Sequence, residues 1–427
     1  MFDRLGATIR FDSIRTQFRM KPQLKNEGAF EEIRRQHVPS GLLRSQTPAL
    51  RPYEPGKGVN RMQGCTDLGN PVAHAIALHG ISKTFGVVTA LHPTDLCVEK
   101  GEFLTLLGPS GSGKTTLLNL IAGAMGPTSG TILLDGRDIT RMPPRERGIG
   151  MVFQNYALMP HMTVFENVAY PLRARRQSSK TIRPKVMEAL DRVGLAGFEN
   201  RKPGQLSGGQ QQRVGIARCI VYSPSIIMMD EPLGALDKNL REQMQGEIKR
   251  LHKDLGITFI YVTHDQEEAL NMSDRICLMG TGQIAQLGTP DELYFKPRSR
   301  FVAEFIGESN LISGRMISAD RMAIAGSRSI SVPGARRPEG SELLVMVRPE
   351  KMRIAGVDEP VTPGTDVLTG EVVSSSFIGG MTRVTVNTDN DLKITAKMIS
   401  DRAESRPAAG ARVQLCWSSS DVVVLEK

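Results

Sequence analysis

The residues best suited to chemistry lie at positions 108–115, where Gly-Pro-Ser-Gly-Ser-Gly-Lys-Thr fits the pattern G-x-x-x-x-G-K-[ST]. Glycines lack a β-carbon, so consecutive backbone amides can turn inward around a phosphate group, and a following helix N-terminus adds partial positive charge. Lys114 would reach the β- and γ-phosphates, and the Thr115 hydroxyl would hold Mg²⁺. A glycine-rich turn that merely carries a lysine is the alternative. The pattern predicts a nucleotide site with the candidate contacts Gly108, Ser110, Gly111, Gly113, Lys114, Thr115 and Thr116.

Two carboxylates, Asp230 and Glu231, follow the apolar run Ile-Ile-Met-Met at positions 226–229. Asp230 would hold Mg²⁺ through a water molecule, and Glu231 would polarise the water that attacks the nucleotide. An isolated Asp-Glu pair after a strand is usually a solvated turn. Because the sequence between the loop lysine and this pair has an α/β pattern, we interpret the pair as part of the same site.

A second anion site is predicted at residues 206–213, Leu-Ser-Gly-Gly-Gln-Gln-Gln-Arg, which lead into a helix. Ser207 and Gly209 expose a hydroxyl and backbone amides at the start of that helix, where anions bind. The sequence thus predicts two phosphate-binding helix starts in one chain, at 108–115 and at 206–213, and the function of the second has to be explained.

A strand and a helix must flank the phosphate loop if the motif is to work, and both are predicted. Residues 102–107 form an apolar run typical of a buried strand, and residues 116–123 are typical of a helix. Further strands are predicted at 130–136, 149–153, 226–229, 258–262 and 276–279, with helices at 238–255 and 266–272 and largely helical structure over 163–200. Strands that alternate with helices indicate βαβ units, so we expect an α/β fold with a largely parallel sheet.

Phe85 lies near the predicted turn between two strands at 76–81 and 97–102, upstream of the phosphate loop. An aromatic side chain there could stack on a nucleotide base, and packing in the core is the alternative. The residue by itself does not decide between the two.

Beyond residue 307 the pattern changes to short β-type runs separated by Gly, Pro, Asn and Asp. The runs are at 311–318, 343–348, 368–376, 382–387, 393–398, 412–417 and 422–425. They predict a small all-β domain, of barrel type. Aromatic residues are too scarce here to stack on the bases of an oligonucleotide, which favours an interaction or regulatory role.

Length and charge limit the remaining possibilities. The 427 residues suffice for two or three domains. Of the net charge of +9, residues 1–70 contribute +5, from 12 Lys and Arg against 7 Asp and Glu, so no nucleic-acid partner is predicted. Residues 1–74 are rich in Arg, Pro, Gly and Gln, and we expect a flexible extension. No apolar run is long enough to span a membrane.

Together these motifs resemble the nucleotide-binding subunits of ATP-binding-cassette transporters, whose signature matches residues 206–210. The resemblance extends over residues 76–307. It implies a P-loop NTPase cassette with a helical subdomain that binds ATP and Mg²⁺ and forms a head-to-tail homodimer. The signature of one subunit, with Ser207 and Gly209, would close over the γ-phosphate held by the other, giving two shared ATP sites.

The same resemblance assigns three further residues. His264, in Val-Thr-His-Asp, corresponds to the residue that senses the γ-phosphate. Gln154, at the end of a predicted strand, corresponds to the glutamine that contacts Mg²⁺ or water and signals to the membrane domain. Asp237 corresponds to the loop that crosses the dimer interface.

The C-terminal part resembles the transport-associated, OB-like β-barrel domain of import-type ATPases, through residues 301–310 and 347–350. The segment Phe-Ile-Gly-Glu-Ser-Asn at 305–310 is similar to the spermidine/putrescine group. The resemblance implies an ATPase coupled to solute uptake, peripheral on the cytoplasmic face of the inner membrane. Its partners would be two membrane-spanning permease subunits and a periplasmic or extracellular solute-binding protein. Import of ferric iron, phosphonate, sulfate or sugar is the alternative, and a soluble ATPase outside transport is a further one.

We therefore expect three parts: an extension at 1–74, a nucleotide-binding domain at 75–307 and a β-barrel domain at 308–427.

Overall fold

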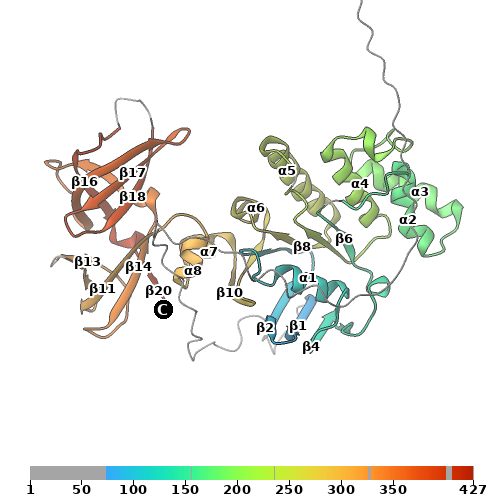
Figure 1. The fold of residues 1–427 in the computed structure, drawn as a ribbon, viewed down its shortest axis with the longest axis horizontal. Coiled ribbons are helices and arrows are strands. Elements are labelled where there is room, and N and C mark those ends of the chain that lie inside the picture. The colour runs from blue at the N-terminus through green and yellow to red at the C-terminus, as the bar shows by residue number, and fades with distance from the viewer. Residues whose placement is uncertain (1–73, 155, 235, 326–327, 401–405, 427) are drawn as a thin grey trace, which may run out of the picture. The chain divides into compact units, whose positions relative to one another are not determined.

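The structure is a computed structural model that describes residues 74–154, 156–234, 236–325, 328–400 and 406–426. The predicted extension at residues 1–74 lies outside the described residues, apart from His74. His74 begins the first strand, and Figure 1 shows helices and strands following one another from there, before a C-terminal part built of strands. Within the described part of the chain, no helix has both the length and the apolar composition needed to cross a bilayer.

A six-stranded sheet forms the centre of the N-terminal part, with the strand order β10-β9-β3-β8-β7-β6. The strands are β3 (Phe103–Leu107), β6 (Gly150–Val152), β7 (Ile226–Asp230), β8 (Thr258–Thr263), β9 (Arg275–Gly280) and β10 (Gln283–Gly288). Strands β9, β3, β8, β7 and β6 pair in parallel, and β10 pairs antiparallel with β9. Every residue of β3 and β8 is buried, as expected of strands covered on both faces. The predicted largely parallel sheet is confirmed.

A second, antiparallel sheet has the strand order β2-β1-β4-β5. Its strands are β1 (His74–Phe85), β2 (Val88–Glu99), β4 (Ser129–Leu134) and β5 (Arg137–Asp138). The strand predicted at 97–102 is wrong in its end, because β2 stops at Glu99 and β3 begins only at Phe103. Gly101, with a φ of 75°, turns the chain between the two strands, a conformation that glycine adopts without a steric penalty.

Helices α1 (Lys114–Ala122), α5 (Lys238–Leu255) and α6 (Gln266–Met272) pack on the main sheet. Helices α2 (Val164–Ala174), α3 (Ser179–Arg192) and α4 (Gly208–Ile220) form the helical subdomain, drawn in green in Figure 1. Two of these helices begin with a capping box: Thr163 with Glu166 for α2, and Ser207 with Gln210 for α4. In this motif the side chains at both ends of the first turn accept hydrogen bonds from backbone amides that would otherwise lack a partner.

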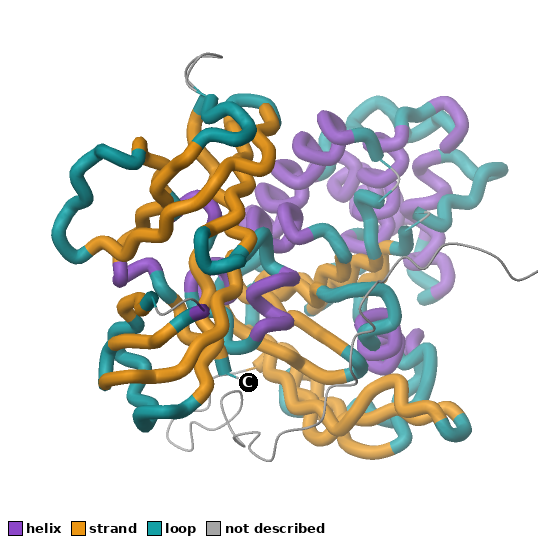
Figure 2. Tube along the Cα trace, turned by 60° about the vertical axis from the view of Figure 1, so that its left-hand side comes forward, coloured by secondary structure: helices purple, strands orange, loops and turns teal. Residues whose placement is uncertain are grey.

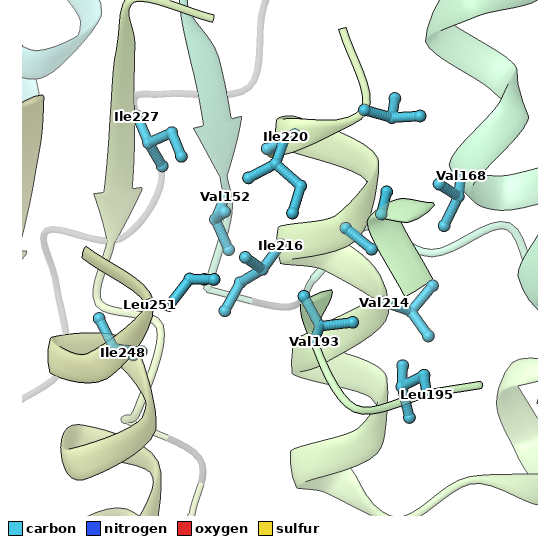
Figure 3. Packing of buried hydrophobic residues seen from close by; sticks show 14 of the residues in the cluster. Val152, Val168, Val193, Leu195, Val214, Ile216, Ile220, Ile227, Ile248 and Leu251 are labelled. Carbon is cyan, nitrogen blue, oxygen red and sulfur yellow. The ribbon is translucent and has the colours of Figure 1, made fainter. Parts of the chain in front are cut away.

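Apolar packing holds the helical subdomain to the sheet. Figure 3 shows Ile216 and Ile220 on the side of α4 that faces Val152 of β6, and Val214 on the other side of α4, near Leu195. Burying one such aliphatic side chain is worth about 1.5–3 kcal/mol. Because both sides of α4 are buried in one cluster, the start of α4 at Ser207 is fixed relative to β6 and β7.

The C-terminal part consists of two five-stranded antiparallel sheets, ordered β13-β12-β11-β14-β20 and β15-β19-β16-β17-β18. Figure 2 shows these strands in orange, joined mostly by loops. The first sheet contains β11 (Asn310–Ser318), β12 (Arg321–Ala323), β13 (Ser329–Ser331), β14 (Glu342–Val347) and β20 (Val423–Leu425). The second contains β15 (Arg353–Gly356), β16 (Thr365–Phe377), β17 (Met381–Thr388), β18 (Lys393–Ile399) and β19 (Arg412–Ser418). Both sheets contribute to one apolar core, which confirms the predicted all-β domain.

Helices α7 (Pro290–Phe295) and α8 (Arg300–Phe305) precede this domain, and Arg348 ties their segment to the end of β14. The Arg348 guanidinium is buried and donates hydrogen bonds to the carbonyl oxygens of Tyr294 (2.7 Å), Ala303 (3.2 Å) and Glu308 (3.1 Å). It also donates to the Ser309 hydroxyl at 2.9 Å. A single side chain thus satisfies three backbone acceptors of the segment.

Candidate active site

The predicted phosphate loop lies between β3 and α1, as the motif requires, and its conformation depends on glycine. Gly108 has a φ of 151°, and a β-carbon there would stand 2.2 Å from the Met279 carbonyl oxygen. Gly113 has a φ of 98°, and a β-carbon there would stand 2.9 Å from the Ala90 carbonyl oxygen. Contacts this short do not occur for real side chains, so larger residues at either position would displace the loop.

Lys114 begins α1 and points back into the loop. Its ammonium group donates to the carbonyl oxygens of Gly108 (2.7 Å) and Pro109 (2.9 Å), and the side chain is only 6% exposed. Burial lowers the pKa of Lys114, while the nearby carboxylates of Glu231 and Asp230 oppose that shift. The lysine is therefore a buried donor held in the centre of the loop, next to two carboxylates.

The other predicted loop contacts surround this lysine. Ser110, Gly111 and Thr115 are exposed, and Thr116 is half-buried. Thr115 and Thr116 stand in the first turn of α1, where backbone amides lack partners within the helix. The first turn carries no acidic residue, so nothing there competes with a bound anion.

Asp230 and Glu231 lie at the carboxyl end of β7, next to the end of β8. Burial, and secondarily Glu231, raise the pKa of Asp230, and Lys114 opposes the shift. Glu231 has a φ of 43°, and its amide donates to the Val262 carbonyl oxygen at 3.0 Å. Left-handed backbone at a residue other than glycine is uncommon and is typical of functional sites. The chain therefore turns at Glu231, directly after β7 ends at Asp230.

His264 follows β8 and contacts Glu231 across the strand ends. Its Nδ1 lies 3.2 Å from Glu231 Oε1, and its side chain is 60% exposed, compared with 28% for Glu231. The structure therefore brings together the loop lysine, both carboxylates and the histidine, which the sequence placed on separate segments. They meet because β3, β8 and β7 are parallel neighbours whose carboxyl ends share one edge, where ligands bind in open α/β sheets.

Gln154 follows β6, and Asp237 ends the loop that begins at Glu231. Gln154 is exposed just after β6, and its Nε2 would be 3.6 Å from a β-carbon built on Gly234, in the loop that follows Glu231. Asp237 caps α5 by accepting from the Leu240 amide at 3.0 Å. Gln154 is thus within reach of the carboxylate loop, whereas the Asp237 side chain is engaged with its own helix.

Phe85 ends β1 and is 50% exposed, with the Lys83 ammonium 5.0 Å from its ring centroid. Half of its surface faces solvent, so packing in the core does not account for it. Stacking on a base stays a prediction.

The signature residues Ser207 and Gly209 do not join the cluster around Lys114. Ser207 Oγ accepts from the Gln210 amide at 3.3 Å, and a β-carbon on Gly209 would be 3.3 Å from Met244 of α5. Among the described residues, no hydrogen bond or ion pair links this helix start to residues 108–115. The two predicted anion sites therefore lie on separate elements of the chain.

The donors around the loop fit Mg²⁺. That ion is typically held by one or two carboxylates together with phosphate oxygens and waters, rather than by a cage of protein ligands. Thr115, Asp230 and Gln154 offer a hydroxyl, a carboxylate and an amide oxygen on the same edge of the sheet. The described residues contain no cluster of three His, Cys, Asp or Glu side chains suited to a metal.

Sequence reasoning missed Arg241, which contacts the residues around His264 and the loop before Asp237. The available signal was its position one turn after Asp237 on α5, but the helix pattern does not reveal which carboxylates it faces.

Comparisons with known proteins identify the family to which the chain belongs. A family model described as "ABC transporter" matches residues 91–234, and one described as "TOBE domain" matches residues 345–425. The chain is 42% identical to the spermidine/putrescine import ATP-binding protein PotA of Rubrobacter xylanophilus, over 86% of this chain and 97% of that protein. Proteins of the same name are 45% identical in Acidothermus cellulolyticus, over 82% of this chain and 94% of the relative, and in Vibrio cholerae, over 84% and 95%. Since the similarity covers nearly the whole of each relative, including both parts described above, this chain belongs to the ATP-binding proteins of ABC transporters that carry a C-terminal TOBE domain.

Proposed function

We propose that this protein hydrolyses ATP to energise the uptake of spermidine or putrescine through an ABC importer. The observation that carries the proposal is the similarity to three import ATP-binding proteins of that name over more than four fifths of the chain. A cassette alone would support ATP hydrolysis without indicating a solute. The solute is proposed because the similarity continues through the C-terminal β domain.

In the proposed reaction the loop at 108–115 binds the phosphates of ATP through backbone amides, and Lys114 places its charge on the β- and γ-phosphates. Thr115, Asp230 and Gln154 would hold Mg²⁺, which neutralises charge that develops on the phosphates. Glu231 accepts a hydrogen bond from the attacking water and orients it. His264, which contacts Glu231 at 3.2 Å, fixes that carboxylate and faces the position of the γ-phosphate.

The proposed working unit is a head-to-tail homodimer with two ATP sites. The separation of Ser207 and Gly209 from Lys114 supports this arrangement, because both helix starts are suited to phosphate and one chain does not bring them together. In the dimer, Ser207 of one copy would complete the site that Lys114 forms in the other, with Asp237 at the interface.

The remaining partners are two membrane-spanning permease subunits and a solute-binding protein on the outer side. The ATPase would sit peripherally on the cytoplasmic face of the membrane. Support for this comes from the import function that the relatives' names state.

The test is ATP hydrolysis by the chain purified with its permease subunits in lipid nanodiscs. Addition of the solute-binding protein with spermidine or putrescine should raise the rate, whereas Glu231→Gln in the same assembly should not respond. Stimulation by ferric iron, phosphonate, sulfate or a sugar, with none by either polyamine, would refute the solute and leave the ATPase intact. Absence of hydrolysis under every condition would refute the function itself.

A further inference from the structure

Arg241 on α5 occupies a junction between the two loops that frame the hydrolysis site. Its Nη2 donates to the Leu236 carbonyl oxygen at 2.9 Å, one residue before Asp237. Its Nη1 lies 3.5 Å from Asp265 Oδ2, and its Nε lies 3.8 Å from Glu268 Oε1. One guanidinium therefore faces a backbone carbonyl of the first loop and two carboxylates that follow His264.

The two carboxylates fix the backbone on both sides of His264. Asp265 caps α6, accepting from the amides of Glu267 (2.8 Å) and Glu268 (3.2 Å). Glu268 accepts from the Thr263 hydroxyl at 2.8 Å, and the Thr263 hydroxyl in turn accepts from the Asp265 amide at 3.0 Å. His264 thus sits between two residues whose positions depend on this network.

Glu268 is an unusual residue to find at such a position, because it is only 4% exposed. Its carboxylate also accepts from the Tyr261 hydroxyl at 2.8 Å. Burial raises the pKa of Glu268, whereas the hydrogen bonds from Thr263 and Tyr261 and the charge of Arg241 oppose the shift. Arg241 is a cation that faces this buried carboxylate, and the attraction between the two charges offsets part of the cost of burying them.

These contacts close a ring around the site. The ring passes from Glu231 along its loop to Leu236, across Arg241 to Asp265 and Glu268, and back through His264 to Glu231. Among these contacts, the bond from Arg241 to the Leu236 carbonyl oxygen has an ordinary hydrogen-bond length of 2.9 Å. The distances from the guanidinium to Asp265 (3.5 Å) and Glu268 (3.8 Å) exceed those of ordinary charge-assisted hydrogen bonds. Arg241 Nε is buried without a hydrogen-bond partner.

We propose that Arg241 is a positioning residue for His264, which it holds in place for ATP hydrolysis through its contacts with Leu236, Asp265 and Glu268. The inference rests on the proposed function, in which His264 and Glu231 act on ATP. The Arg241 backbone amide donates to the Asp237 carbonyl oxygen at 2.9 Å, but among the described residues its side chain forms no hydrogen bond or ion pair with the predicted phosphate contacts at 108–116. Its removal should lower turnover without weakening ATP binding.

The test compares steady-state ATP hydrolysis by the full chain and by Arg241→Met, which keeps the aliphatic stem but removes the charge and all donors. We expect kcat to fall about tenfold, the size of effect that misplacement of a catalytic group produces, with KM for ATP nearly unchanged. Arg241→Lys should recover part of the loss, because it restores a charge near Asp265 and Glu268 but not the fork that also reaches Leu236.

Lys249→Met is the matched control. Lys249 lies on the same helix and also bridges to α6, donating to the Asn271 carbonyl oxygen at 2.7 Å, but it lies outside the ring. It should keep the wild-type kcat. A comparable loss in Lys249→Met would overturn the proposal, because any contact between α5 and α6 would then have the same effect. A wild-type kcat in Arg241→Met would overturn it by showing that Arg241 does not affect turnover.

A double variant separates an action through His264 from loss of structure. In a His264→Ala background, measured by single turnover, adding Arg241→Met should change the rate by less than about twofold, because the step it acts on has already been removed. A full further tenfold loss would contradict the proposal. Thermal unfolding and fluorescent-nucleotide binding of each variant report the folded fraction, to which rates are normalised. If the wild-type chain hydrolyses no ATP, the proposed function fails instead.

Discussion

At the scale of single residues, the site combines a strained backbone with carboxylates of different burial. Glu231 keeps its left-handed φ of 43° because its amide is held by Val262 of the neighbouring strand. The strain and the contact with His264 both place the Glu231 carboxylate, while Lys114 and Asp230 are placed by the loop and by β7.

Glu231→Gln should abolish turnover and preserve ATP binding. The substitution removes the carboxylate that orients water but no group that would contact phosphate, and losses from such changes are typically about 10²–10⁴-fold in rate. The measurement is ATP hydrolysis together with nucleotide affinity. The exposed Glu267, in the first turn of α6, gives the control Glu267→Gln, which should behave as wild type. Near-normal hydrolysis by Glu231→Gln would remove Glu231 from the mechanism.

Lys114→Ala should instead weaken nucleotide binding itself. The buried ammonium is the charge held at the centre of the loop, and hydrogen bonds from charged donors to phosphate are roughly twice as strong as neutral ones. Equilibrium binding of a fluorescent ATP analogue measures the effect, with Lys253→Ala, on the exposed surface of α5, as the control. Equal affinity in the two variants would contradict the role of Lys114.

At the scale of elements, the features that matter are the ones that join segments far apart in the sequence. Helix α4 joins the signature to the sheet through Ile216 and Ile220, and Arg348 joins the α7–α8 segment to β14. In each case the sequence of the element does not indicate which partner its side chains contact.

Arg348→Met should destabilise the protein. It removes the guanidinium donor from the carbonyl oxygens of Tyr294, Ala303 and Glu308, of which Ala303 still accepts from the Ser309 hydroxyl at 2.7 Å. Each buried acceptor left unsatisfied costs about 1–3 kcal/mol. Calorimetry should show a lower unfolding temperature, with the transition of the β domain separating from that of the cassette. Arg300→Met, which loses only a surface ion pair with Glu304, should melt as wild type does. Identical melting curves for the two variants would show that Arg348 does not hold these elements.

At the scale of the whole molecule, the proposed site requires two copies of the chain. Lys114 and Ser207 lie on separate elements, so a variant at each position damages a different half of the same shared site.

Ser207→Arg should leave ATP binding by the monomer intact but block turnover, because a long charged side chain would occupy the surface that closes over the partner's phosphate. Mixed with Lys114→Ala, it should yield a rate below wild type yet above either variant alone, since the mixed dimer contains one undamaged site. Hydrolysis rates of the separate and mixed proteins provide the measurement. Wild-type turnover by Ser207→Arg alone would refute the shared-site arrangement.

The sequence by itself determined the local structure around the phosphate loop and the parallel sheet. The roles of Gly108, Gly113 and Lys114 can be recognised locally, because glycine is the residue that adopts a positive φ without a steric penalty and the lysine follows at a fixed spacing. Helices at 238–255 and 266–272 were predicted with their observed ends, since Asp237 and Asp265 are caps that can be recognised from residue type. The short strands β12, β13 and β15 were missed, because so short a run carries no measurable periodicity, whereas the equally short β6 and β20 were predicted from their apolar runs.

Only the tertiary structure decided which side chains meet. The His264–Glu231 contact depends on β7 and β8 being parallel neighbours, and strand order is not encoded in the spacing of either segment. The position of Arg241 between Leu236, Asp265 and Glu268 depends on how α5 rotates against α6, which is set by apolar packing of the whole domain. Phe85 shows the same limit, because its exposure is a property of the finished surface, not of the turn in which it lies. Chemistry that follows from residue type and local spacing can be predicted from the sequence, whereas contacts between distant segments exist only once the core has fixed the strand order and the orientation of the helices.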